Sequence, residues 1–131
     1  MGTRATIHFG NEAIIYRHWD GYLKGLGNDI AEFIRLVDSS VHDKRFSDPS
    51  YLAAKWVVHD AERYTEGENR LEFLSVGIVR EDPGDIDYRY HVDVNHGGRL
   101  PKLTAEDAEG HVRWSYHFEE GKWEINEETV A

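Results

Sequence analysis

The most constraining feature of the chain is a run from Ile86 to Asn95 in which apolar and polar residues alternate without a break. The apolar members are Ile86, Tyr88, Tyr90, Val92 and Val94, and the polar members are Asp87, Arg89, His91, Asp93 and Asn95. Successive side chains of a strand point to opposite faces, so this run predicts a strand with one face in the core. The stretch from Val112 to Phe118 repeats the pattern. Something else must cover the apolar face of this sheet.

Two helical segments can supply that cover. Asn28 is a suitable N-cap for a helix whose apolar residues, Ile30, Phe33, Ile34 and Val37, recur at helical spacing. Asp48 followed by Pro49 predicts the start of a second helix. Ahead of both, residues 5–9 and 13–18 flank the turn residues Gly10 and Asn11 and predict a hairpin.

These patterns predict one α+β domain over residues 1–125, followed by a flexible acidic tail over residues 126–131. We expect an N-terminal β-hairpin, two helices, and then four or five antiparallel strands, with the helices packed on one face of the sheet. Residues 71–80 are apolar on both strand faces, which favours a central strand.

Charge and composition exclude several classes of function. The net charge is −10, from 25 acidic and 15 basic residues, so duplex nucleic acid would be repelled. The absence of cysteine excludes disulfides and thiolate sites and favours a reducing cytoplasm. We find neither a membrane-spanning run nor a signal-peptide pattern, and expect a cytoplasmic protein with no membrane partner. The acidity indicates solubility or, alternatively, mimicry of nucleic acid toward a basic protein.

The segment from Tyr16 to Tyr22 is hard to explain by folding alone. It contains Tyr16, Arg17, His18, Trp19, Asp20, Gly21 and Tyr22 in consecutive positions. Aromatic rings offer stacking surfaces, and a guanidinium suits phosphate or carboxylate. The segment leads into a predicted helix N-terminus, which favours anions. Alternatively, Trp19 and Tyr22 cap the edge of the core while Asp20 pairs with Arg17.

A second group of basic side chains lies on the polar faces of the two alternating strands. Arg89, His91, Arg113 and His117 would form a cationic patch on an acidic molecule, to which Arg17 could add if its strand is adjacent. The alternative is that Asp87, Asp93 and Glu119 neutralise them as cross-strand pairs.

The sequence offers little support for catalysis or for a metal. Ser75 and Ser115 lie in predicted strands without a nucleophile-elbow motif. The spacing of His91 with Asp93, and of His18 with Asp20, is compatible with metal ligands. Exposed histidines on the polar face of a strand that bind no metal show the same spacing. We therefore expect no enzyme activity, no cofactor and no bound metal.

The Tyr16–Tyr22 segment resembles a family of small proteins encoded by phages, prophages and their bacterial hosts. The family motif reads Tyr-(Arg/Cys)-His-Trp-Asp-Gly-Tyr-Pro, and Leu23 stands here in place of the proline, so the loop backbone is less fixed. The Asp85–Tyr90 segment is similar to a second family element, Asp-Ile-Glu-Tyr-x-Tyr. The family is similar to the oligomeric phage anti-defence sponges of the Thoeris system, which sequester cyclic ADP-ribose isomers.

The resemblance implies a non-catalytic, homo-oligomeric protein that sequesters a small anionic nucleotide signal. A purine would stack on Trp19 or Tyr22, and a pyrophosphate would be held by Arg17, Arg89 or Arg113. The predicted ligand-binding residues are Arg17, His18, Trp19, Asp20, Tyr22, Arg89, His91 and Arg113. The alternatives are an acidic inhibitor that binds a host defence protein, as an anti-CRISPR protein does, and a nucleotide-processing enzyme.

Overall fold

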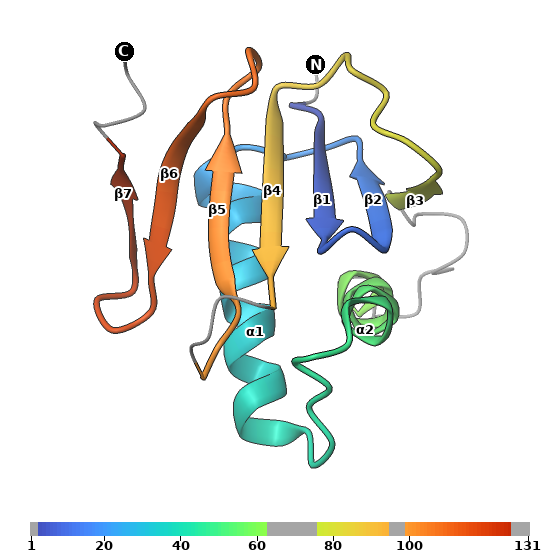
Figure 1. The fold of residues 1–131 in the computed structure, drawn as a ribbon, viewed down its shortest axis with the longest axis vertical. Coiled ribbons are helices and arrows are strands. Elements are labelled where there is room, and N and C mark those ends of the chain that lie inside the picture. The colour runs from blue at the N-terminus through green and yellow to red at the C-terminus, as the bar shows by residue number, and fades with distance from the viewer. Residues whose placement is uncertain (1–2, 63–75, 95–98, 127–131) are drawn as a thin grey trace.

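A computed structural model describes residues 3–62, 76–94 and 99–126 and shows an α+β fold (Figure 1). Its helices are α1 (Asn28–Ser40) and α2 (Pro49–Ala61). Its strands are β1 (Ala5–Phe9), β2 (Ala13–Arg17), β3 (Val76–Val79), β4 (Tyr88–Asp93), β5 (Lys102–Glu106), β6 (Val112–His117) and β7 (Lys122–Ile125). The predicted fold class, the opening hairpin and the two helices are confirmed. Residues 71–75 and all of the predicted tail (126–131) except Asn126 lie outside the described residues.

The sheet differs from the prediction in its strand directions. Its seven strands follow the order β3-β2-β1-β4-β5-β6-β7. Strands β1 and β4 are parallel, with Ile7 opposite Tyr90, whereas the other neighbouring strands are antiparallel. The strands β4 to β7 after the helices are antiparallel to one another, as predicted, but the pairing of β4 with β1 makes the whole sheet mixed. The chain crosses over through both helices before β4, and such a crossover allows a parallel pair.

The core lies between both helices and one face of the sheet. Its buried members include Ile7, Phe9, Ile15, Tyr90, Val92 and Leu103 from the strands, Ile30 and Ile34 from α1, and Leu52 and Trp56 from α2. In Figure 1, α1 runs behind β4 and β5, and α2 is seen end-on below β1 and β2. No helix of the described ranges covers the opposite face, which carries the polar halves of the alternating strands.

Two local expectations are corrected. Strand β3 pairs only with β2 among the described strands, so it is an edge strand, and its Ile78 is 78% exposed. Asn28 is the first residue of α1 and not its N-cap, because a π-helical turn over Leu23–Gly27 precedes it. The second helix begins at Pro49 after the N-cap Asp48, as predicted.

Candidate functional site

The Trp19 loop, residues 18–25, follows β2 and runs into the π-helical turn, and it is tightly packed at its glycines. A Cβ added at Gly21 would lie 2.7 Å from the Thr3 carbonyl oxygen, and one at Gly25 would lie 2.6 Å from that of Asp20. The Tyr90 hydroxyl donates a 2.6 Å hydrogen bond to the Gly21 carbonyl oxygen. Asp20 has a positive φ of 57°, which is uncommon for a residue with a side chain. The backbone of this loop is therefore held in one shape.

The aromatic rings of this loop do not cap the core. Trp19 is 49% exposed and Tyr22 is 43% exposed. The His18 ring meets Trp19 edge to face at 4.6 Å, and the Tyr16 hydroxyl lies 2.8 Å from His18 Nδ1. The neighbouring Leu26 fills the core position instead. Two large rings remain available on the surface.

Arg17, by contrast, is a core residue. It is 1% exposed, and its Nη1 lies 2.9 Å from Asp60 Oδ1 on α2 and 3.7 Å from Asp29 Oδ2 on α1. Burial raises the pKa of the Asp60 carboxyl, and Arg17 opposes that rise. The guanidinium therefore neutralises the buried carboxylate of Asp60 and also lies near the partly buried one of Asp29. It is not presented to a ligand.

The other predicted cations lie on the opposite face of the sheet. Arg17 pairs in register with Ala5 on the core face, whereas Arg89 pairs with Thr6 one residue further along and points the other way. Arg17 and Arg89 therefore do not converge on one ligand. Arg89 Nε donates to Asp82 Oδ2 at 2.6 Å, and Arg113 Nε donates to Asp107 Oδ2 at 2.7 Å.

The carboxylates on this open face differ from those suggested by the sequence. His91 Nε2 lies 2.6 Å from Glu106 Oε2, and the His91 ring stands 5.0 Å from that of His8 on the parallel strand. Burial opposes the ionisation of Asp82, but hydrogen bonds from Arg89, the Gly84 N–H and His8 outweigh it and lower the pKa of this carboxyl to about 2. The network pins the segment before β4 onto the sheet, so its cations are already matched.

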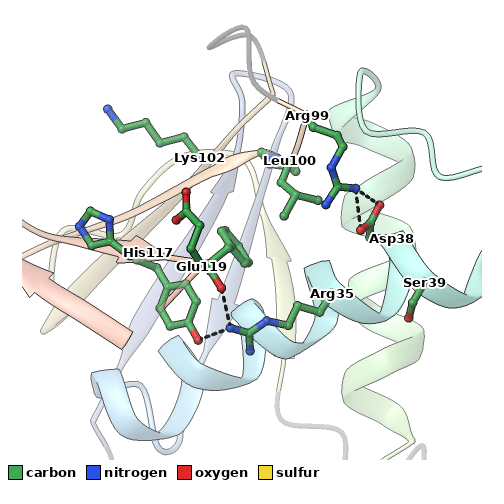
Figure 2. Close-up of a pocket in the computed structure, with 11 residues that line it drawn as sticks. Arg35, Asp38, Ser39, Arg99, Leu100, Lys102, His117 and Glu119 are labelled. Atoms are coloured by element: carbon green, nitrogen blue, oxygen red, sulfur yellow. Dashed lines mark hydrogen bonds and ion pairs between the residues drawn. The ribbon is translucent and has the colours of Figure 1, made fainter. Parts of the chain in front are cut away.

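A larger pocket, of about 770 Å³, lies between α1 and the ends of β5 and β6 (Figure 2). Its lining includes none of the eight predicted ligand-binding residues, although His117 of the predicted cationic patch lies there. The basic lining residues are Arg35, Arg99, Lys102 and His117, the acidic ones are Asp38 and Glu119, and the remaining ones are Ser39, Leu100, Pro101, Tyr116 and Phe118. Three side chains with permanent positive charge thus face two carboxylates, on a protein whose net charge is −10.

Arg35 is the best-placed cation of this pocket, which we call the Arg35 pocket. Its Nη2 donates to the Tyr116 hydroxyl at 2.9 Å and to the Phe118 carbonyl oxygen at 3.4 Å (Figure 2). The guanidinium lies 5.4 Å from the Tyr116 ring centroid and 5.7 Å from that of Phe118. Among the described residues it forms no ion pair with a carboxylate, unlike Arg17, Arg89 and Arg113. Its charge is oriented but not neutralised.

The second arginine of the pocket is paired. Arg99 Nη1 donates to both oxygens of Asp38 at 2.7 Å, and Lys44 donates to the same carboxylate at 2.9 Å. The hydrogen bonds from Arg99 and Lys44 lower the pKa of Asp38. Asp38 therefore keeps its negative charge and holds Arg99 at the rim of the pocket.

One signal in the sequence could have indicated Arg35. It is the only basic residue of α1, among Asp29, Glu32 and Asp38. A lone cation on an acidic helix can pair with those acids one turn away, so the pattern alone does not mark a site. The aromatic partners Tyr116 and Phe118 come from a distant part of the chain, and only the fold brings them to Arg35.

One acidic group near the Trp19 loop has the spacing of metal ligands. Single ligand atoms of Asp29, Glu32 and His59 lie within 4.8 Å of one another. Asp29 is already engaged by Arg17 and by His59 Nε2, which lies 3.4 Å from its Oδ1. These contacts account for the cluster, and we assign no metal to it.

Comparison with known proteins identifies no relative. No family model matches the chain, and no curated protein and no solved structure is significantly similar to it. Within the described ranges, no helix has the length and apolar character needed to cross a membrane.

Proposed function

We propose that the protein is a non-catalytic binder that captures a small anionic ligand of the nucleotide class in the Arg35 pocket. The observation that carries the proposal is the Arg35 guanidinium, which is fixed by Tyr116 and Phe118 and has no carboxylate partner among the described residues. A phosphate group would supply the missing negative charge through short, charge-assisted hydrogen bonds.

The walls of the pocket suit the rest of a nucleotide. Phe118, Leu100 and Pro101 line it with apolar surface, against which a base or a ribose can pack. Lys102 adds positive charge near the rim, where a second phosphate would interact. The volume of about 770 Å³ is within the range of small-molecule sites.

The chemistry of the lining supports capture without conversion. Ser39 is the one serine in the lining of the pocket. Its hydroxyl is hydrogen-bonded to the Leu36 carbonyl oxygen and to the Ser40 hydroxyl. His117 is engaged with Glu124 on the neighbouring strand, at 3.0 Å. Neither contact forms the nucleophile–base pair that covalent catalysis requires. The family resemblance of the Tyr16–Tyr22 segment points the same way, toward sequestration of a signal such as cyclic ADP-ribose by a phage-type protein in the host cytoplasm.

Calorimetry with cyclic ADP-ribose, ADP-ribose and pyrophosphate tests this function. We expect binding of at least one of the three and a loss of affinity of about tenfold or more in Arg35→Ala, because hydrogen bonds to a charged group contribute about 1.5–3 kcal/mol. Arg80→Ala is the matched control, since it removes an exposed arginine next to the distant edge strand β3. Equal affinity of the two variants, or no heat with any probe, would exclude the proposal.

Recovery of the ligand distinguishes capture from chemistry. The bound nucleotide should be released unchanged, by mass, after the protein is denatured. Conversion to a product of different mass would establish the alternative of a nucleotide-processing enzyme.

A further inference from the structure

The Arg35 pocket contains a carboxylate that the proposed function does not use. Glu119 lines the pocket, and among the described residues its side chain forms neither a hydrogen bond nor an ion pair. The other carboxylate of the lining, Asp38, is bonded to Arg99 and Lys44. In Figure 2 the Glu119 side chain extends away from the Arg35 guanidinium, which is held by two neutral oxygens. Within the described structure, the pocket therefore offers an available acceptor as well as an available cation.

The turn between β6 and β7 holds Glu119 in place. The N–H groups of the two residues after it both donate to the His117 carbonyl oxygen, at 3.2 and 2.8 Å. Arg35 donates to the carbonyl oxygen of Phe118, the residue before it. The turn ends at Gly121, whose positive φ of 69° is a conformation that glycine adopts without strain. The backbone that carries the Glu119 carboxylate is therefore fixed relative to the Arg35 guanidinium.

A carboxylate in a nucleotide site suits the sugar and not the phosphates. An ionised carboxylate only accepts hydrogen bonds, and its charge repels a phosphate. The 2′ and 3′ hydroxyls of ribose are neighbouring donors, and the two oxygens of one carboxylate can accept from both. Dinucleotide-binding sites use an acidic residue in this way, beside a separate site for the pyrophosphate.

We propose that Glu119 binds the 2′,3′-diol of the nucleotide captured in the Arg35 pocket. The inference rests on the proposed function and narrows its ligand to a ribonucleotide whose two hydroxyls are unsubstituted. Arg35 alone would hold the phosphate of any nucleotide, because a guanidinium recognises the phosphate and not the sugar. Glu119 is thus the residue that determines which sugar is accepted.

The expected discrimination is moderate. A nucleotide without the two hydroxyls leaves the Glu119 carboxylate without its donors, and a site built to bind hydroxyl groups rejects such an analogue. Because Glu119 is exposed, water can replace part of the lost hydrogen bonding. We therefore expect a preference of about tenfold for the ribonucleotide.

Calorimetry with ADP and 2′,3′-dideoxy-ADP tests the inference. Wild type should bind ADP about tenfold more tightly than the dideoxy analogue, and Glu119→Ala should bind the two equally. Glu120→Ala is the matched control, because it removes the same charge from the next position of the turn. The Glu120 carboxylate lies 3.8 Å from Lys122 Nζ and does not line the pocket, so this variant should keep the preference. Circular dichroism of each variant confirms that the fold is retained.

The outcomes separate this inference from the proposed function. Equal affinity of wild type for the two nucleotides would overturn the assignment of Glu119 and leave the phosphate site at Arg35 standing. A preference that persists in Glu119→Ala, or that disappears equally in Glu120→Ala, would also overturn it. If pyrophosphate binds and ADP does not, the inference fails alone. If none of these probes and no cyclic ADP-ribose or ADP-ribose binds, the proposed function fails and this inference fails with it.

Discussion

At the scale of single residues, four arginines of this protein show how context decides what a cation does. Arg17 is buried against Asp60, and Arg89 and Arg113 are bonded to Asp82 and Asp107. Arg35 alone among these four is held by a hydroxyl and a carbonyl oxygen, which orient the guanidinium without neutralising it. Three of these arginines thus stabilise the fold, and the fourth, Arg35, can still pair with an anion.

The Arg17–Asp60 pair gives a stability prediction. Arg17→Met leaves the buried carboxylate of Asp60 without its counter-charge, so we expect a loss of about 3–5 kcal/mol in the free energy of unfolding. The double variant Arg17→Met/Asp60→Leu should recover most of that loss, because it removes both charges. Urea denaturation measures both effects. A double variant no more stable than the single one would contradict the interpretation of the pair.

Asp82 predicts how stability depends on pH. Its pKa is about 2 in the folded protein, below its ordinary value of 3.8, so the folded state favours the ionised form. That contribution is complete above about pH 4 and is lost as the pH falls through 2. Asp82→Asn should lower the stability at neutral pH by about 2 kcal/mol and flatten its decline over this window. Unchanged acid unfolding in Asp82→Asn would contradict the assignment.

At the scale of elements, the Trp19 loop depends on glycines at closely packed positions. Gly21→Ala should destabilise the fold by about 2 kcal/mol, since the new methyl group would lie 2.7 Å from the Thr3 carbonyl oxygen. Gly77→Ala on β3 is the control, because its Cβ would meet no atom within 4 Å. Thermal unfolding compares the two variants. A greater loss in Gly77→Ala would show that the packing around Gly21 is misjudged.

Local signals predicted the elements well where one residue determines the geometry. Pro at the first helical position placed the start of α2 at Pro49, and alternation placed β4 and β6. The prediction of Asn28 as an N-cap was wrong because the π-helical turn before it already supplies helical backbone, so no N-cap is needed there. The prediction of a central strand at β3 was wrong because an apolar run is compatible with an edge strand as well as with a central one. Its place in the sheet depends on its pairing with β2.

At the scale of the whole molecule, strand order was the property that the sequence did not reveal. The parallel pairing of β1 with β4 follows from the crossover through both helices, and no local pattern encodes which strand lies beside β1. That pairing sets the two sheet faces and therefore separates Arg17 from Arg89. The Arg35 pocket is formed by α1, the start of β5 and the end of β6. Its strand residues are far from the Tyr16–Tyr22 segment in the sequence.

The overall charge distribution follows from the same arrangement. The open face carries matched pairs such as His91 with Glu106, whereas the Arg35 pocket carries a guanidinium that has no carboxylate partner among the described residues. An acidic molecule can therefore still offer a site for an anion. The central claim is that a nucleotide binds in the Arg35 pocket and not at the Trp19 loop.

Titration of isotope-labelled protein with cyclic ADP-ribose, followed by amide and indole NMR signals, tests this claim most directly. We predict that the signals of Arg35, Tyr116 and Phe118 shift and saturate together, while the Trp19 indole signal does not move. Saturating shifts confined to Trp19 and Tyr22, with Arg35 unaffected, would contradict the account.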